Sequence, residues 1–138
     1  MEGNALSGMI PTAISALPRL QVMSLSENNL TGSVSTSVFC NCSVHAPSLR
    51  IVHLGLNGFT DFVGPETSTC FSVLQVLDIQ HNRMRGTFPL WLTNVTTLTV
   101  LDVSSNTLSG EVPAQIGNLV KLEELKMANN SLSGATVE

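Results

Sequence analysis

One pattern of leucine-like residues around a single asparagine recurs along the whole chain. Its full form is Leu-x-x-Leu-x-Leu-x-x-Asn-x-Leu-x-Gly-x-Ile-Pro, with Val, Ile, Met or Phe replacing individual leucines. Repetition with a fixed period of twenty to thirty residues is typical of a solenoid, in which each repeat is one coil stacked on the next. The asparagines stand at Asn4, Asn28, Asn57, Asn82, Asn106 and Asn130, so the spacings by subtraction are 24, 29, 25, 24 and 24 residues.

Each part of the pattern has a physical interpretation. The alternation in Leu-x-Leu is that of a short strand, with one set of side chains turned inward and the other outward. The Asn amide both donates and accepts, so it can satisfy backbone groups left unpaired where the chain turns away from the strand. Gly eases a tight bend, and the following Pro suits an extended segment at an edge. We expect a buried ladder formed by Asn28, Asn57, Asn82, Asn106 and Asn130.

These features predict a leucine-rich repeat solenoid of the α/β class. Short parallel strands would line the concave face of a horseshoe, and the convex side would be irregular or 3-10 helical. No coil buries its apolar side alone, so stacked coils must share one core. We expect residues 1–138 to form a single domain of about five coils plus a partial first coil, uncapped at both ends.

Composition restricts the function. Charged residues make up 12% of the 138 residues and the net charge is -4, against about 25% charged residues in ordinary soluble domains. Six Lys and Arg residues cannot supply the basic stripe that a nucleic-acid partner requires. No apolar run approaches the roughly 20 residues of a membrane span. The opening MEGNALSGMIP carries an acid where a secretion signal is basic, so we expect neither signal nor membrane contact from this segment.

The full pattern resembles the plant-specific leucine-rich repeat, and Leu92-x-x-Val95-x-x-Leu98 supplies its leading positions. The stretch from Pro89 to Gly134 especially resembles the ectodomain of a plant leucine-rich repeat receptor-like serine/threonine kinase. That resemblance implies an extracellular recognition module for signal perception, placed on the outer face of the plasma membrane as part of a longer receptor. It also implies a peptide or protein ligand, with a co-receptor ectodomain as a further partner, and no cofactor. Kinase-less receptor-like proteins and secreted polygalacturonase inhibitors share the repeat and stay open as alternatives.

The chain departs from the family pattern in its third interval and at its ends. After Asn57, the sequence TDFVGPETSTC replaces Gly-x-Ile-Pro, and the last coil lacks Ile-Pro. Receptors of this family carry paired-cysteine caps at both ends of the solenoid, and neither cap is present here. Uncapped coils leave ladder edges open to water. We therefore interpret the chain as an internal part of a longer protein.

Three cysteines and four glycosylation sequons are consistent with an extracellular setting. Cys40 and Cys70 fall at equivalent places on neighbouring coils, and stacked coils lie roughly 5 Å apart, within reach of a disulfide. We hypothesise a bridge from Cys70 to Cys40 or Cys42, the alternative being three ordinary small apolar residues. The sequons Asn-x-Ser/Thr begin at Asn29, Asn41, Asn94 and Asn129.

No catalytic chemistry is predicted for this chain. It contains no Gly-x-Gly-x-x-Gly, no phosphate-binding Gly-Lys loop and no His-Arg-Asp or Asp-Phe-Gly motif, so we expect no enzyme activity from it. His45, His53 and His81 have no spacing that suggests a metal site or a catalytic triad. Since two of the three cysteines are one residue apart, a structural zinc site is not expected either.

Function should therefore lie in the variable positions that point out of the strands. The residue between the two leucines of Leu-x-Leu forms one column across the coils, namely Ser24, His53, Asp78, Asp102 and Lys126. Two further columns follow it along the chain, Ser26, Gly55, Gln80, Ser104 and Ala128, and then Glu27, Leu56, His81, Ser105 and Asn129. In receptors of this family the concave face binds peptides or small hormones. The resemblance thus implies ligand contacts from His53, Asp78, Gln80, His81, Asp102, Ser104 and Lys126.

The inward positions are expected to form the core. Trp91, the only tryptophan, follows the edge segment at a variable position, so we expect it to be partly buried on the convex flank. The residues expected to be buried are Leu77, Ile79, Leu98, Leu101, Val103, Leu122 and Leu125.

Overall fold

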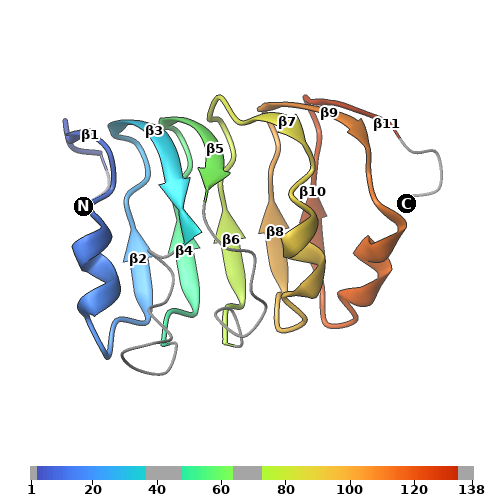
Figure 1. The fold of residues 1–138 in the computed structure, drawn as a ribbon, viewed down its shortest axis with the longest axis horizontal. Coiled ribbons are helices and arrows are strands. Elements are labelled where there is room, and N and C mark those ends of the chain that lie inside the picture. Colours follow the sequence, from blue (N-terminus) through green and yellow to red (C-terminus); the bar gives the residue numbers. More distant parts are fainter. Residues whose placement is uncertain (1–2, 37–47, 64–72, 134–138) are drawn as a thin grey trace.

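A five-stranded parallel sheet runs the length of the molecule. The computed structural model describes residues 3–36, 48–63 and 73–133. Each coil contributes one three-residue strand, and every strand pairs with its counterparts in the neighbouring coils (Figure 1). The predicted leucine-rich repeat solenoid is confirmed. In spatial order the strands are β10 (Glu124–Lys126), β8 (Val100–Asp102), β6 (Val76–Asp78), β4 (Ile51–His53) and β2 (Val22–Ser24).

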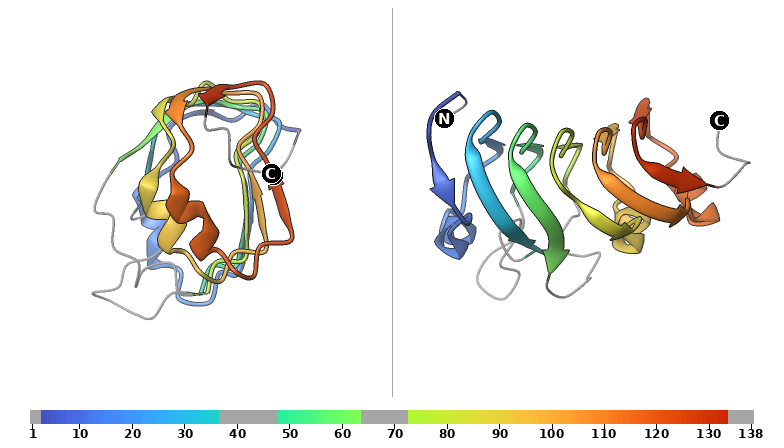
Figure 2. Two further views of the ribbon diagram at one scale, coloured as in Figure 1. Left: turned by 90° about the vertical axis from the view of Figure 1, so that its right-hand side faces the viewer. Right: turned by 90° about the horizontal axis from the view of Figure 1, so that it is seen from above.

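Short 3-10 helices form the wall opposite this sheet, as the view along the solenoid shows (Figure 2, left). They are η1 (Thr12–Ala16), η4 (Leu90–Asn94) and η5 (Ala114–Asn118), and each begins directly after a proline. Proline fixes φ near −65° and needs no hydrogen-bond acceptor, so it ends the preceding extended segment and starts a helical turn. This agrees with the predicted 3-10 helical convex side. Within the described ranges, no helix is long and apolar enough to cross a membrane.

Two further parallel sheets, which together we call the side wall, cover the side between the five-stranded sheet and the 3-10 helices. One pairs β1 (Ser7–Gly8), β3 (Asn29–Ser35) and β5 (Gly58–Val63), and the other pairs β7 (Arg85–Thr87), β9 (Thr107–Glu111) and β11 (Ser131–Ser133). The sequence pattern predicts only an extended segment here, because a single coil does not reveal that neighbouring segments pair. Glycine at the fourth position after the ladder asparagine adopts a left-handed conformation in four coils, which an ordinary residue rarely adopts. These glycines are Gly8, Gly32, Gly86 and Gly110, with φ between 81° and 86°.

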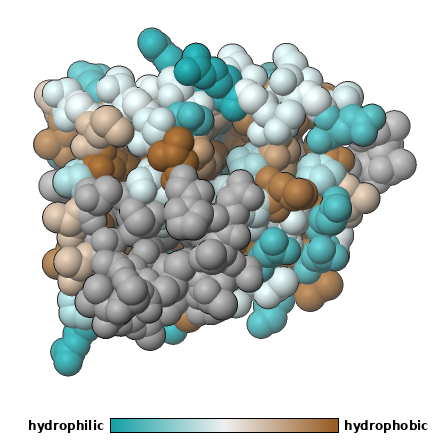
Figure 3. Space-filling view, viewed as in Figure 1, coloured by the Kyte–Doolittle hydropathy of each residue, from teal (hydrophilic) through white to brown (hydrophobic). Residues whose placement is uncertain are grey.

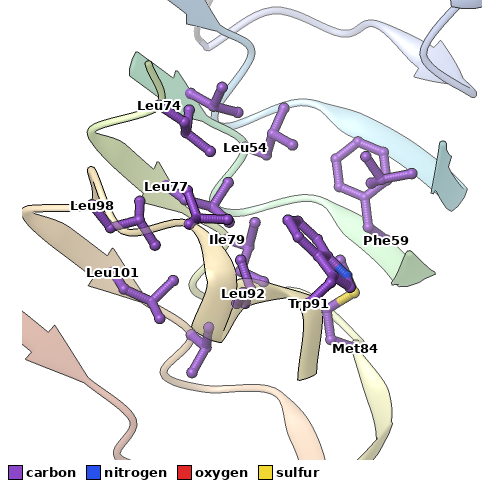
Figure 4. Close-up of a cluster of buried hydrophobic side chains, with 14 of the residues drawn as sticks. Leu54, Phe59, Leu74, Leu77, Ile79, Met84, Trp91, Leu92, Leu98 and Leu101 are labelled. Atoms are coloured by element: carbon purple, nitrogen blue, oxygen red, sulfur yellow. The ribbon is translucent and has the colours of Figure 1, made fainter. Parts of the chain in front are cut away.

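The core is one cluster that extends through all coils. Leu77, Ile79 and Leu101 are fully buried in it, as the leucine pattern predicts. Leu122 and Leu125 were expected to be buried but are only half-buried, because they belong to the last described coil and no described residue covers its outer side. Figure 4 shows the central part of the cluster.

The expectation for Trp91 was wrong. The 3-10 turn after Pro89 points its second residue inward, so Trp91 is 4% exposed while Leu90 is 50% exposed. The indole lies close to Met84 in the core (Figure 4). The ring of Phe62 meets it edge-on, with centroids 5.2 Å apart and planes at 85°. Trp91 is therefore a core residue, not a residue of the convex surface.

The asparagines of the repeat connect successive coils. Asn106 shows the arrangement: its Nδ2 donates to the carbonyl oxygens of Val103 in its own coil (3.1 Å) and Ile79 in the preceding coil (3.0 Å), and its Oδ1 accepts from the backbone N–H of Met84 (2.9 Å). One amide thus satisfies backbone groups of two coils at the point where the chain leaves the strand. The same bridging contacts are made by Asn57, Asn82 and Asn130, and Asn28 accepts from the preceding coil and donates within its own.

Candidate functional site

Side chains of the five-stranded sheet that face solvent form a surface that we call the sheet face. Its central column is in strand register: Ser24 pairs with His53, His53 with Asp78, Asp78 with Asp102, and Asp102 with Lys126. Parallel strands lie about 4.8 Å apart, so consecutive side chains of the column are immediate neighbours. The structure therefore brings two carboxylates together at the centre of the column, between a histidine and a lysine.

Asp78 and Asp102 are held in place by the backbone. Asp78 Oδ1 accepts from the backbone N–H of Gln80 (3.1 Å), and Asp102 Oδ1 accepts from the N–H (3.0 Å) and the hydroxyl (2.5 Å) of Ser104. In both turns the Asp carboxylate accepts a hydrogen bond from the backbone N–H of the residue two positions later in the chain. The second oxygen of Asp78 lies 3.4 Å from Nδ1 of His53, whose side chain is 37% exposed against 21% for the aspartate. Such a contact becomes an ion pair when the imidazole is protonated.

The second column lies deeper than the sequence indicates. Ser26 and Gly55 are buried, and Gln80 and Ser104 are half-buried. Gly55 leaves room for the side chain of Gln80, because a Cβ on Gly55 would collide with the Gln80 amide. The Gln80 amide oxygen in turn contacts Nδ1 of His81. The absence of a Cβ at Gly55 thus makes room for the Gln80 amide, which contacts His81.

The third column has a backbone feature that the sequence did not predict. His81 has φ 53°, and its backbone N–H donates to the carbonyl oxygen of Ser104 in the next coil (3.0 Å). The left-handed turn continues the coil-to-coil hydrogen bonding past the end of the strand. His81 and Asn129 are residue types enriched in this conformation, whereas Glu27, Leu56 and Ser105 are not, so residue identity gave only a partial signal. The column comprises Glu27, Leu56, His81, Ser105 and Asn129, with φ between 53° and 59°.

An apolar column that sequence reasoning missed lies beside the polar one. It consists of the first residue of each strand of the five-stranded sheet, and its members are in register across β2, β4, β6 and β8. The repeat alignment contained this signal, because the position is aliphatic in four successive coils. The sheet face therefore offers a line of apolar side chains next to a line of charges. Its members are Val22, Ile51, Val76 and Val100, after which Glu124 ends the column.

The sequon residues within the described ranges are exposed. Asn29 starts β3, Asn94 ends η4, and Asn129 stands at the rim of the sheet face with its Nδ2 3.4 Å from the Ser105 hydroxyl. The sequon at Asn41 and the proposed disulfide among Cys40, Cys42 and Cys70 lie outside the described residues. Among described side chains, no cluster of three His, Cys, Asp or Glu residues could hold a metal ion.

The fold and the asparagine ladder define a repeat protein in which the residues of the sheet face vary from coil to coil. Leucine-rich repeat models match residues 19–42 and 72–132. The chain therefore belongs to the leucine-rich repeat family.

The chain is similar to several plant receptor proteins. Receptor-like protein 43 of Arabidopsis thaliana is 33% identical over 90 residues, which are 64% of this chain and 12% of that protein. The plant peptide hormone receptor RGFR1 in complex with RGF2 superposes with a TM-score of 0.82 at 35% identity, over 94% of this chain and 20% of that one. The Arabidopsis receptor kinase HAESA in complex with the peptide hormone IDA and the co-receptor SERK1 gives a TM-score of 0.78 at 30% identity, over 96% of this chain and 21% of that one. The chain spans 9 to 13% of the length of the curated relatives it matches.

Proposed function

We propose that this chain is a ligand-recognition segment in the extracellular part of a plant cell-surface receptor. The observation that carries the proposal is the sheet face, where Asp78 and Asp102 are adjacent, held by backbone donors, and lie next to an aliphatic column. Fixed carboxylates bind a cation without the entropic cost of ordering their side chains first. Support comes also from the similar receptors whose structures hold peptide hormones.

The ligand that this face fits is an extended peptide or a protein segment with a cationic group and aliphatic side chains. The cationic group would contact Asp78 and Asp102, the aliphatic side chains would pack on the column of Val76 and Val100, and polar groups would meet the remaining predicted contacts. Those remaining contacts are His53, Gln80, His81, Ser104 and Lys126. A co-receptor ectodomain is a further partner by analogy with the HAESA complex.

The parent protein has two candidate forms. A receptor-like serine/threonine kinase would transmit the signal through its own kinase domain, and a receptor-like protein without a kinase would depend on a partner. The sequence relatives are named receptor-like proteins, which supports the second form. A kinase assay of the full-length protein, purified with and without its intracellular part, distinguishes the two forms. Kinase activity that depends on the intracellular part identifies the receptor kinase.

The binding proposal is tested by selecting peptides from a random display library against the chain. Isothermal titration calorimetry then compares the selected peptides on the wild type, on Asp78→Ala with Asp102→Ala, and on Glu111→Ala with Glu123→Ala, which removes the same charge from exposed positions outside the three columns. We expect the first double variant to lose binding of cationic peptides, with an unchanged unfolding midpoint, and the second to bind normally. Unchanged affinity in the first variant would refute the proposal.

The extracellular setting has a separate test. Protein made in a plant secretory system should lose mass on enzymatic deglycosylation, through glycans at Asn29, Asn94 or Asn129, and mass spectrometry would locate them. A glycan at Asn129 would narrow access to the sheet face from its C-terminal end. If no mass is lost, the secretory assignment fails.

A further inference from the structure

The row of residues that directly follow the ladder asparagines has a gap. Asn29, Arg83 and Thr107 hold this position in three coils, and the backbone N–H of each donates to a carbonyl oxygen of the preceding coil (2.8, 2.8 and 2.7 Å). In the coil of Asn57 the position is Gly58, which has no side chain. Because neighbouring parallel strands lie about 4.8 Å apart, Asn29 and Arg83 flank the glycine at close range.

A notch of about 200 Å³ lies at this gap, and its lining includes Asn29, Thr31, Leu56, Gly58 and Arg83. It lies on the ridge between the sheet face and the side wall, since Leu56 belongs to the third column while Asn29 and Thr31 belong to β3. The side-wall strands begin along the upper edge of Figure 1, and the same edge is mainly hydrophilic in Figure 3. Pockets for small molecules usually exceed roughly 300 Å³, so the notch suits a single ring-sized group.

The notch offers hydrogen-bond donors beside an apolar side chain. Arg83 is exposed, and within the described ranges no carboxylate pairs with its guanidinium, which carries several N–H donors. Leu56 is 43% exposed in its left-handed turn. The ladder amides that also line the notch are engaged with backbone groups. The group that fits here therefore has oxygen acceptors on one side and C–H groups on another, as a sugar ring does.

A glycosylation acceptor stands in the wall of the notch. Asn29 and Thr31, the first and third residues of the sequon Asn29-Leu-Thr31, both line it and both are exposed. The sequon residues Asn94 and Asn129 do not line it. A sugar attached to the side-chain nitrogen of Asn29 thus starts at the notch, next to the gap that Gly58 leaves.

We propose that the notch holds the first N-acetylglucosamine of a glycan on Asn29, an inference that rests on the secretory setting proposed above. Asn29 Nδ2 attacks C1 of that sugar in a lipid-pyrophosphate-linked oligosaccharide. The new C–N bond replaces the C–O bond to pyrophosphate, and the amide loses one proton. The attached sugar lies over Gly58, packs its C–H groups on Leu56 and accepts hydrogen bonds from Arg83. It fills the place of the missing side chain and links three successive coils.

Glycopeptide mass spectrometry of the wild-type chain made in a plant secretory system separates this inference from the setting on which it rests. We expect Asn29 to carry a glycan. Glycans at Asn94 or Asn129 without one at Asn29 would overturn the inference and leave the secretory setting intact. If no sequon carries a glycan, both are overturned.

The position of the sugar is tested on a chain with one sequon. Ser43→Ala, Thr96→Ala and Ser131→Ala remove the others, and an endoglycosidase trims the Asn29 glycan to one N-acetylglucosamine. We expect nuclear Overhauser contacts between the sugar and the methyl groups of Leu56. The unfolding temperature should exceed that of the same sequence made without glycan in the bacterial cytoplasm by about 2–4 °C, with both samples in reducing buffer.

Arg83→Ala should remove most of that rise in unfolding temperature. Arg85→Ala, the same change at an exposed arginine outside the notch, should retain it. Each variant is compared with its own unglycosylated form, so that the effect of the substitution itself cancels. The inference is overturned if the sugar shows no contact with Leu56, or if the rise is equally large in the two variants, because the glycan then stabilises the chain without occupying the notch.

Discussion

At the residue scale, single side chains carry the connection between coils. The side chain of Asn106 hydrogen-bonds four backbone groups, two in its own coil and two in the preceding coil, and Asn106 is 7% exposed. Water cannot replace these hydrogen bonds in so buried a place. Asparagine suits the position because one amide can donate and accept at once.

Replacing Asn106 with alanine should therefore destabilise the chain far more than replacing an exposed asparagine. We expect Asn106→Ala to lower the free energy of unfolding by about 1–3 kcal/mol, the cost of leaving buried backbone groups unpaired. Asn118→Ala, at an exposed position in η5, should change it little. Urea unfolding followed by circular dichroism measures both, and equal effects of the two substitutions would contradict the ladder account.

Leucine is a poor residue for the left-handed turn that Leu56 occupies. It has φ 58° and is 43% exposed, so it gains little from burial. Leu56→Asn should stabilise the chain by part of the roughly 1–2 kcal/mol that this conformation costs an ordinary residue. Leu17→Asn is the matched control, since Leu17 is 52% exposed but has φ −82°. A stabilisation of equal size at both positions would show that hydrophobic exposure, and not backbone strain, is responsible.

At the element scale, the glycines of the side wall determine the path of each coil. Gly86 and Gly117 both have open space where a Cβ would stand, but only Gly86 has a positive φ. Gly86→Ala should cost more than about 1 kcal/mol, while Gly117→Ala should be neutral or stabilising by about 0.4–1 kcal/mol. Thermal unfolding of the two variants tests this contrast. Equal unfolding temperatures for the two variants would mean that the left-handed turn at Gly86 does not stabilise the side wall.

Much of this element-level structure could be predicted from the repeat. The period, the strands of the five-stranded sheet and the register of His53, Asp78 and Asp102 follow from aligning the repeats on their asparagines. They do so because every coil packs equivalent residues against its neighbours in the same way. The side-wall pairing could not be predicted, since it depends on contacts between coils. Trp91 was misplaced for a related reason: the direction of its side chain is set by the 3-10 turn after Pro89, which the leucine pattern does not specify.

At the scale of the whole molecule, stability should fall toward the last coil. Leu101 is fully buried between β6 and β10, while Leu125 is half-buried on the edge strand. Leu101→Ala should cost about 2–5 kcal/mol, and Leu125→Ala distinctly less. Hydrogen exchange should likewise be slowest in β6 and β8. Equal costs for the two substitutions would imply that other residues cover the outer side of the last coil.

We propose that the repeats form a scaffold and that the columns of the sheet face carry the recognition. The most direct test is a crystal structure of the chain with a peptide selected for binding to it. We predict that the peptide crosses β4, β6 and β8, with a cationic group in contact with the carboxylates of Asp78 and Asp102 and with aliphatic side chains on Ile51, Val76 or Val100. A selected peptide bound elsewhere, with Asp78 and Asp102 left in solvent, would contradict the claim.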